Sequence, residues 1–137
     1  MSIVRRENDP RGTLLTDVVV PAGGIPAGSA VAIAGNEYAL CGAFLTDYAD
    51  SFFGFVESER SPGKIAFVIT RRGTIVTPRV EGSLPLIPNE EVYLSLTPGL
   101  VTQTLNLQPG MNVIRVGVAK TSTTMVFITD ARQTIGG

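Results

Sequence analysis

The residues of this chain that could do chemistry are few and scattered. Histidine, the commonest general base and metal ligand, is absent, and Cys41 is the single cysteine. A serine nucleophile would have neither a histidine base nor a Ser-x-x-Lys motif to activate it. The seven glutamates and five aspartates stand mostly beside turn residues. We therefore expect a protein that is not an enzyme and carries no cofactor; a hydrolase whose carboxylates converge only in the fold is the alternative.

Asp47 and Asp50 are the acidic pair that most suggests a metal site. The segment around them lacks the glycine and the terminal glutamate of a calcium-binding loop, so we interpret the pair as a solvated turn and expect no metal. Cys41 has no partner for an internal disulfide. We expect its side chain to be a small buried hydrophobic group.

Three arginines, Arg5, Arg6 and Arg11, stand in the first twelve residues, MSIVRRENDPRG. This segment has almost nothing apolar after Val4, so burial cannot offset the entropic cost of ordering it. The sequence predicts a flexible N-terminal arm over residues 1–12, which is either a frayed end or a segment that orders against a partner. Because guanidinium groups pair with carboxylates in a bidentate manner, the three arginines are candidate contacts to a protein partner.

The pattern of apolar residues predicts strands throughout. Short apolar and polar alternations rich in β-branched residues recur about every 8–12 residues, as in all-β sandwiches and barrels. Expected strands cover residues 14–20, 30–34, 51–56, 64–76, 91–96, 100–107, 111–120 and 123–129. Turns containing Pro-Gly separate the later ones, at residues 97–99 and 108–110. The predicted fold is a compact antiparallel β-barrel or β-sandwich over residues 13–130, with a flexible C-terminal tail at 131–137.

Three segments allow more than one interpretation. Residues 36–53 have apolar residues at helical spacing, but Gly42 interrupts them and the neighbouring segments indicate strands, so we favour strand, loop and strand. The loop PAGGIPAG at 21–28 is rich in glycine, which would also fit a phosphate-binding loop. Phosphate-binding loops open a helix, whereas a strand is expected here, so we do not expect this loop to bind a nucleotide. Arg71 and Arg72 stand at a bulge or hairpin tip. On a strand they would point to opposite faces, so only one would belong to a given contact surface.

The composition of the chain limits the classes of partner that we expect it to bind. Eleven basic side chains balance twelve acidic ones in 137 residues, so neither nucleic acid nor an anionic membrane is expected to bind. No apolar run approaches the roughly 18 residues of a membrane span, and we expect a soluble single domain made in a reducing cytoplasm. The mean hydropathy of +0.26 is high for a monomer with so many turns, which suggests that apolar surface closes a subunit interface.

The order of motifs resembles a family of phage structural proteins. Val92, Tyr93, Gly99, Val101, Thr102, Val116, Gly117 and Ala119 occur in strand-turn-strand order, after the upstream run VVVPAGGIPAGSAVAIAG. These features are similar to those of the capsid decoration (cement) proteins and head-fibre base domains of tailed bacteriophages. The resemblance is weakest over residues 36–60, which contain a loop with two aspartates.

The resemblance implies a virion structural protein, not an enzyme, on the outer surface of a capsid. Its partner would be the major capsid protein, it would often be a homotrimer, and it would be synthesised in the host cytoplasm. The alternative is an accessory module of the tail or baseplate that binds a host surface glycan. Exposed aromatic residues in the loops would carry that function, and Tyr38, Tyr48 and Phe52 are the candidates.

Overall fold

The computed structural model describes residues 10–58, 61–128 and 133–134. Its strands are β1 (Gly12–Leu14), β2 (Ala30–Ala34), β3 (Glu37–Leu40), β4 (Phe52–Val56), β5 (Phe67–Ile69), β6 (Ile75–Val76), β7 (Glu91–Leu94), β8 (Val101–Thr102), β9 (Asn112–Val113), β10 (Arg115–Ala119), β11 (Met125–Phe127) and β12 (Gln133–Thr134). The helical elements among these residues are three single 3-10 turns, η1 (Leu45–Asp47), η2 (Ala49–Ser51) and η3 (Glu81–Ser83). The prediction of an all-β fold is confirmed.

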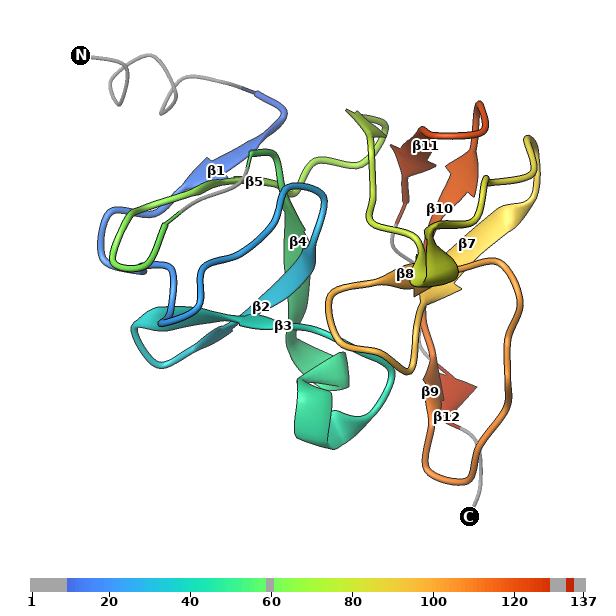
Figure 1. Cartoon of the computed structure of the whole chain (residues 1–137), viewed down its shortest axis with the longest axis horizontal. Coiled ribbons are helices and arrows are strands. Elements are labelled where there is room, and N and C mark those ends of the chain that lie inside the picture. The colour runs from blue at the N-terminus through green and yellow to red at the C-terminus, as the bar shows by residue number, and fades with distance from the viewer. Residues whose placement is uncertain (1–9, 59–60, 129–132, 135–137) are drawn as a thin grey trace.

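The strands form two five-stranded sheets, each built from one half of the sequence. The first sheet has the order β1-β5-β4-β2-β3 and the second has the order β6-β11-β10-β7-β8. Figure 1 shows the blue-to-green half of the chain beside the yellow-to-red half. The ladders between these strands are antiparallel. A separate ladder joins β9 to β12, and the remainder of the predicted tail lies outside the described residues.

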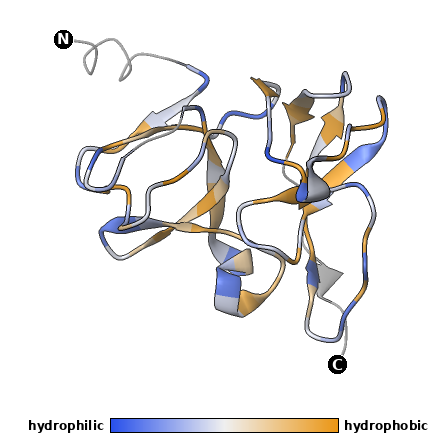
Figure 2. Cartoon of the chain, in the orientation of Figure 1, coloured by the Kyte–Doolittle hydropathy of each residue, from blue (hydrophilic) through white to orange (hydrophobic). Residues whose placement is uncertain are grey.

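Strand alternation divides the first sheet between two apolar clusters. Ala30 and Phe55 belong to a core that both sheets share, whereas their neighbours Val31 and Val56 belong to a second cluster. Because successive side chains of a strand point to opposite faces, the sheet buries both of its faces. The second sheet supplies Val92, Leu94, Val116, Met125 and Phe127 to the shared core. The arrangement is that of a sandwich, and Figure 2 shows apolar residues concentrated on the strands of both sheets.

The second cluster is closed by residues 15–28, which differ from their prediction. The strand expected over residues 14–20 ends at Leu14, so that prediction is wrong for the rest of the segment. Val18 and Val20 are buried in the second cluster, yet the described pairing of residues 15–20 is an isolated bridge, from Val19 to Glu37. The backbone of Val19 hydrogen-bonds with Asn36 and Tyr38, so the segment lies against the edge strand β3 without continuing as a ladder. Apolar burial alone does not distinguish such a segment from a strand.

The apolar run at residues 64–76 is divided between the sheets. We expected a pair of adjoining strands, but β5 pairs with β1 and β4, whereas β6 pairs with β11. Both interpretations of Arg71 and Arg72, as a bulge and as a hairpin tip, are therefore wrong. They lie in the turn that carries the chain from the first sheet to the second, which we call the arginine turn (residues 70–74).

Two other segments, residues 36–53 and 100–107, can be compared with their predictions. Residues 36–53 form β3, the turns η1 and η2, and then β4, so the interpretation as strand, loop and strand is confirmed. The strand expected over residues 100–107 stops after Thr102. The hydroxyl of Thr102 accepts a hydrogen bond from the N–H of Thr104 and donates one to the carbonyl of Thr104, each at 3.1 Å. Such local hydrogen bonds compete with those of a strand ladder.

Backbone hydrogen bonds join the two halves of the chain. The N–H of Ala30 donates to the carbonyl of Gly99 at 3.0 Å, and the N–H of Arg79 donates to the carbonyl of Gly28 at 2.9 Å. Gly28 has φ +81°, and a Cβ there would lie 2.5 Å from the carbonyl oxygen of Thr77. The glycine of the PAGGIPAG loop thus allows a close contact between the two halves of the chain.

Candidate functional site

The predicted N-terminal arm is described only from Pro10. Arg5 and Arg6 lie outside the described residues, and Gly12 already belongs to β1. Arg11 contacts the first sheet: its Nη1 lies 2.6 Å from Oε2 of Glu57, and its guanidinium lies 5.5 Å from the centre of the Phe67 ring. Its carbonyl also accepts hydrogen bonds from the arginine turn. Of the three predicted contact residues, the structure thus places Arg11 and shows it bound within the chain.

Arg71 and Arg72 lie beside Arg11, which the sequence did not reveal. Both are exposed, and together with Arg11 and Pro10 they line a depression of about 370 Å³. The expectation that only one of the pair would belong to a given surface assumed a strand, and the turn removes that restriction. The signal that could have indicated a turn is Gly73, which follows the two arginines and has φ +94°.

Asp47, Asp50 and Cys41 lie near one another without forming a reactive site. Cys41 is buried, and its Sγ donates to the carbonyl of Tyr48 at 3.2 Å. Burial first, and then the charges of Asp47 and Asp50, raise the pKa of this thiol to about 12, so it stays protonated and unreactive at neutral pH. Within the described residues, no three His, Cys, Asp or Glu side chains come together to hold a metal ion.

The aromatic residues expected of a glycan-binding module do not share a surface. Tyr38 is 1% exposed, and burial raises the pKa of its hydroxyl to about 12, with a further contribution from Asp17. Phe52 is half-buried and packs edge to face against Phe55. Tyr48 alone of the three is exposed. The three rings therefore do not form a stacking platform for a sugar.

A different surface carries exposed apolar side chains on a fixed backbone. Residues 80–87 lie between β6 and β7 of the second sheet and include η3, and we call them the apolar ledge. Leu84 and Ile87 are 65% and 55% exposed, although Leu86 between them is buried in the core. Val80, Leu84, Pro85 and Leu100 contribute the apolar lining of an adjoining cavity of about 520 Å³.

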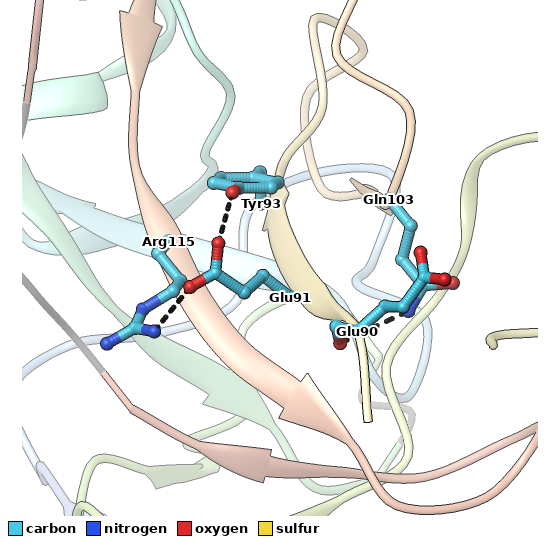
Figure 3. A network of polar contacts seen from close by, with 5 residues as sticks. All are labelled: Glu90, Glu91, Tyr93, Gln103 and Arg115. Atoms are coloured by element: carbon cyan, nitrogen blue, oxygen red, sulfur yellow. Dashed lines mark hydrogen bonds and ion pairs between the residues drawn. The ribbon is translucent and has the colours of Figure 1, made fainter. Parts of the chain in front are cut away.

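Hydrogen bonds hold the apolar ledge from both sides. The N–H of Leu86 donates to the carbonyl of Ser122 at 2.8 Å. On the other side, Oε1 of Gln103 accepts from the N–H of Ile87 at 2.7 Å, and Nε2 of Gln103 donates to the carbonyl of Ile87 at 3.0 Å. Nε2 also donates to the carbonyl of Glu90 at 3.3 Å, as Figure 3 shows. The exposed side chains are thus presented by a rigid segment, which lowers the entropic cost of binding.

Beside the ledge, β7 and β10 carry a polar cluster. Glu91 accepts hydrogen bonds from the hydroxyl of Tyr93 and from Nη1 of Arg115, each at 2.6 Å (Figure 3). The bond from Tyr93 first, and then that from Arg115, lower the pKa of Glu91. The same bond raises the pKa of Tyr93. Hydrogen bonds thus join the three side chains across the strand pair.

The described residues thus offer two candidate surfaces for binding. The surfaces are the apolar ledge and the depression beside the arginine turn, and the two cavities share no lining residue. In the described part of the chain, no helix is long and apolar enough to cross a membrane. No known protein family, curated protein or solved structure matches this chain.

Proposed function

We propose that this chain is a virion structural protein that binds the outer surface of a tailed-phage capsid and stabilises it, as a homotrimer. The partner is the major capsid protein. The motif order of the sequence supports the assignment to a virion. The all-β body supports it too, because rigid sheets suit a protein that acts by contact. Many copies with weak individual contacts stabilise a shell through multivalency.

The structural observation that carries this proposal is the apolar ledge. Leu84 and Ile87 expose apolar side chains beside a cavity, on a backbone that Gln103 and Ser122 hold in place. Exposed apolar patches of this kind mark interaction sites. We assign the ledge to contacts between copies of the chain, because copies related by a three-fold axis would each cover the ledge of a neighbour.

The capsid contact is assigned to the N-terminal arm and the surface from which it departs. Arg11 lies at that point and is held by Glu57 and Phe67. Arg5 and Arg6 precede it by a few residues. In this proposal Arg11 anchors the arm, and Arg5 and Arg6 reach carboxylates on the capsid.

A binding experiment with capsids tests the proposal. Capsids of the encoding phage that lack this chain should bind the purified protein to saturation and should then resist heating better. Deleting residues 1–9 leaves β1 and the Arg11 contacts in place, so the fold should persist while capsid binding weakens severely. If the deletion variant saturates capsids at the same concentration as the full chain, the arm does not contribute. If the full chain does not bind capsids at all, the proposed function is wrong.

The assignment of the ledge has its own test. Light scattering after size-exclusion chromatography should give three times the 14.5 kDa mass of the chain. The double variant Leu84→Asp/Ile87→Asp should give the monomer mass with an unchanged far-UV circular dichroism spectrum. Leu45→Asp/Leu107→Asp is the matched control, because these leucines are also exposed, at 58% and 57%, but lie outside residues 80–87. A trimer that survives the double variant would place the subunit contact elsewhere.

A further inference from the structure

The arginine turn is held as firmly as the apolar ledge. The N–H groups of Thr70 and Arg71 both donate to the carbonyl of Arg11, at 3.2 and 3.1 Å. On the opposite side, the N–H of Gly73 donates to the carbonyl of Phe127, and the N–H of Phe127 donates to the carbonyl of Thr74, both at 2.8 Å. The backbone of the turn is thus fixed to residue 11, directly before β1, and to β11 of the second sheet.

The side chains that this turn presents are two exposed arginines. Arg11 contributes the third guanidinium to the same depression, but Glu57 already compensates its charge. Among the described residues, no ion pair involves Arg71 or Arg72. Two adjacent cationic groups therefore face solvent without a charge partner in the described part of the chain, beside the depression of about 370 Å³.

We propose that the arginine turn is a docking site for an acidic protein segment, in which Arg71 and Arg72 bind Asp or Glu side chains. The guanidinium fork matches a carboxylate and favours arginine over lysine for this contact. Ile75, which follows the turn directly, is 48% exposed and offers an apolar contact to residues flanking the carboxylates. The inference rests on the proposed function for the identity of the partner, which is then an acidic surface segment of the capsid protein.

Charge and lining favour an acidic protein over a nucleic acid. The whole chain has a net charge of −1, and the depression is lined by Pro10, Arg11, Arg71, Arg72, Gly73 and Thr74, without an aromatic residue. Binding of a nucleic acid requires an extended basic surface, and single strands also require rings on which bases stack. Two arginines beside a compensated third provide neither.

The test uses a fluorescein-labelled peptide of alternating glutamate and serine, with oligo-dT as the competing probe. Fluorescence anisotropy should show that the full chain binds the peptide, that about 1 M salt abolishes binding, and that oligo-dT binds less tightly. Arg71→Gln/Arg72→Gln should weaken peptide binding about fivefold, the effect of losing two exposed ion pairs. Lys64→Gln/Lys120→Gln removes the same charge at two exposed positions outside the depression, so it should change binding by less than about twofold.

Three outcomes would overturn the inference. They are absence of peptide binding by the full chain, equal weakening by both double variants, and tighter binding of oligo-dT than of the peptide. None of these results depends on capsids. Failure here with intact capsid binding would leave the proposed function standing, whereas peptide binding without capsid binding would leave the docking site without the proposed partner.

Discussion

The aromatic contact between the two sheets gives the sharpest test of the fold. Phe127 is 2% exposed, and its ring centre lies 6.0 Å from that of Phe52 and 5.7 Å from that of Phe55, in edge-to-face orientation. Phe127→Ala removes this buried ring and leaves a cavity, so it should lower the free energy of unfolding by about 3–5 kcal/mol. Phe127→Leu keeps much of the volume but loses both aromatic pairs, which should cost about 1–3 kcal/mol.

Urea unfolding measures these losses, and hydrogen exchange locates them. Because Phe127 belongs to the second sheet and its partners belong to the first, β2 and β10 should lose protection together in Phe127→Ala. The exposed Leu107→Ala serves as control and should change the free energy of unfolding by less than about 0.5 kcal/mol. Separate transitions for the two sheets, or a loss below about 1 kcal/mol in Phe127→Ala, would refute the shared core.

Three further predictions concern single sites. Cys41 should resist thiol reagents in the native state at pH 8, as measured by labelling rate. Because the pKa of this thiol is raised in the folded state, its contribution to stability is fully present below the unfolded pKa and is lost as pH rises to about 12. Fast labelling of the native protein would contradict this prediction. Gly54→Ala would place a Cβ 2.2 Å from the carbonyl oxygen of Ile69, so thermal unfolding should show a loss of about 3 kcal/mol, and an unchanged midpoint would contradict the packing. Gln103→Leu removes the hydrogen bonds to Ile87, so exchange at the ledge should accelerate while β2 stays protected.

The sequence was sufficient to predict the strand content but not the partners of the strands. Alternation and the Pro-Gly turn at residues 97–99 indicate β7, because Val92 and Leu94 are buried on one face of this strand and the turn follows it. The run at residues 64–76 shows why strand pairing could not be predicted from the sequence. Its two halves look alike as apolar strands, and only the tertiary fold decides that Phe67 packs in the first sheet while Val76 belongs to the second. The strand predicted over residues 14–20 is wrong for a related reason, because a segment that makes an isolated bridge and a strand bury similar side chains.

The candidate surfaces were less predictable than the fold. The arginines of the arm could be selected from charge alone, but the proximity of Arg11 to Arg71 and Arg72 results from the pairing of β1 with β5. The apolar ledge had no local signal, because Leu84 and Ile87 resemble the core residue Leu86 in sequence. Their exposure depends on the way Gln103, sixteen residues away from Ile87, holds the backbone.

The central claim is that this chain binds the outside of a capsid, and an image of the particle tests it most directly. Cryo-electron microscopy of intact virions of the encoding phage should show the two-sheet body as trimers on the outer capsid surface. The arginine turn and residue 10 should face the major capsid protein, and each apolar ledge should be covered by a neighbouring copy. Virions whose capsid lacks this density, or whose tail or baseplate carries it instead, would contradict the account.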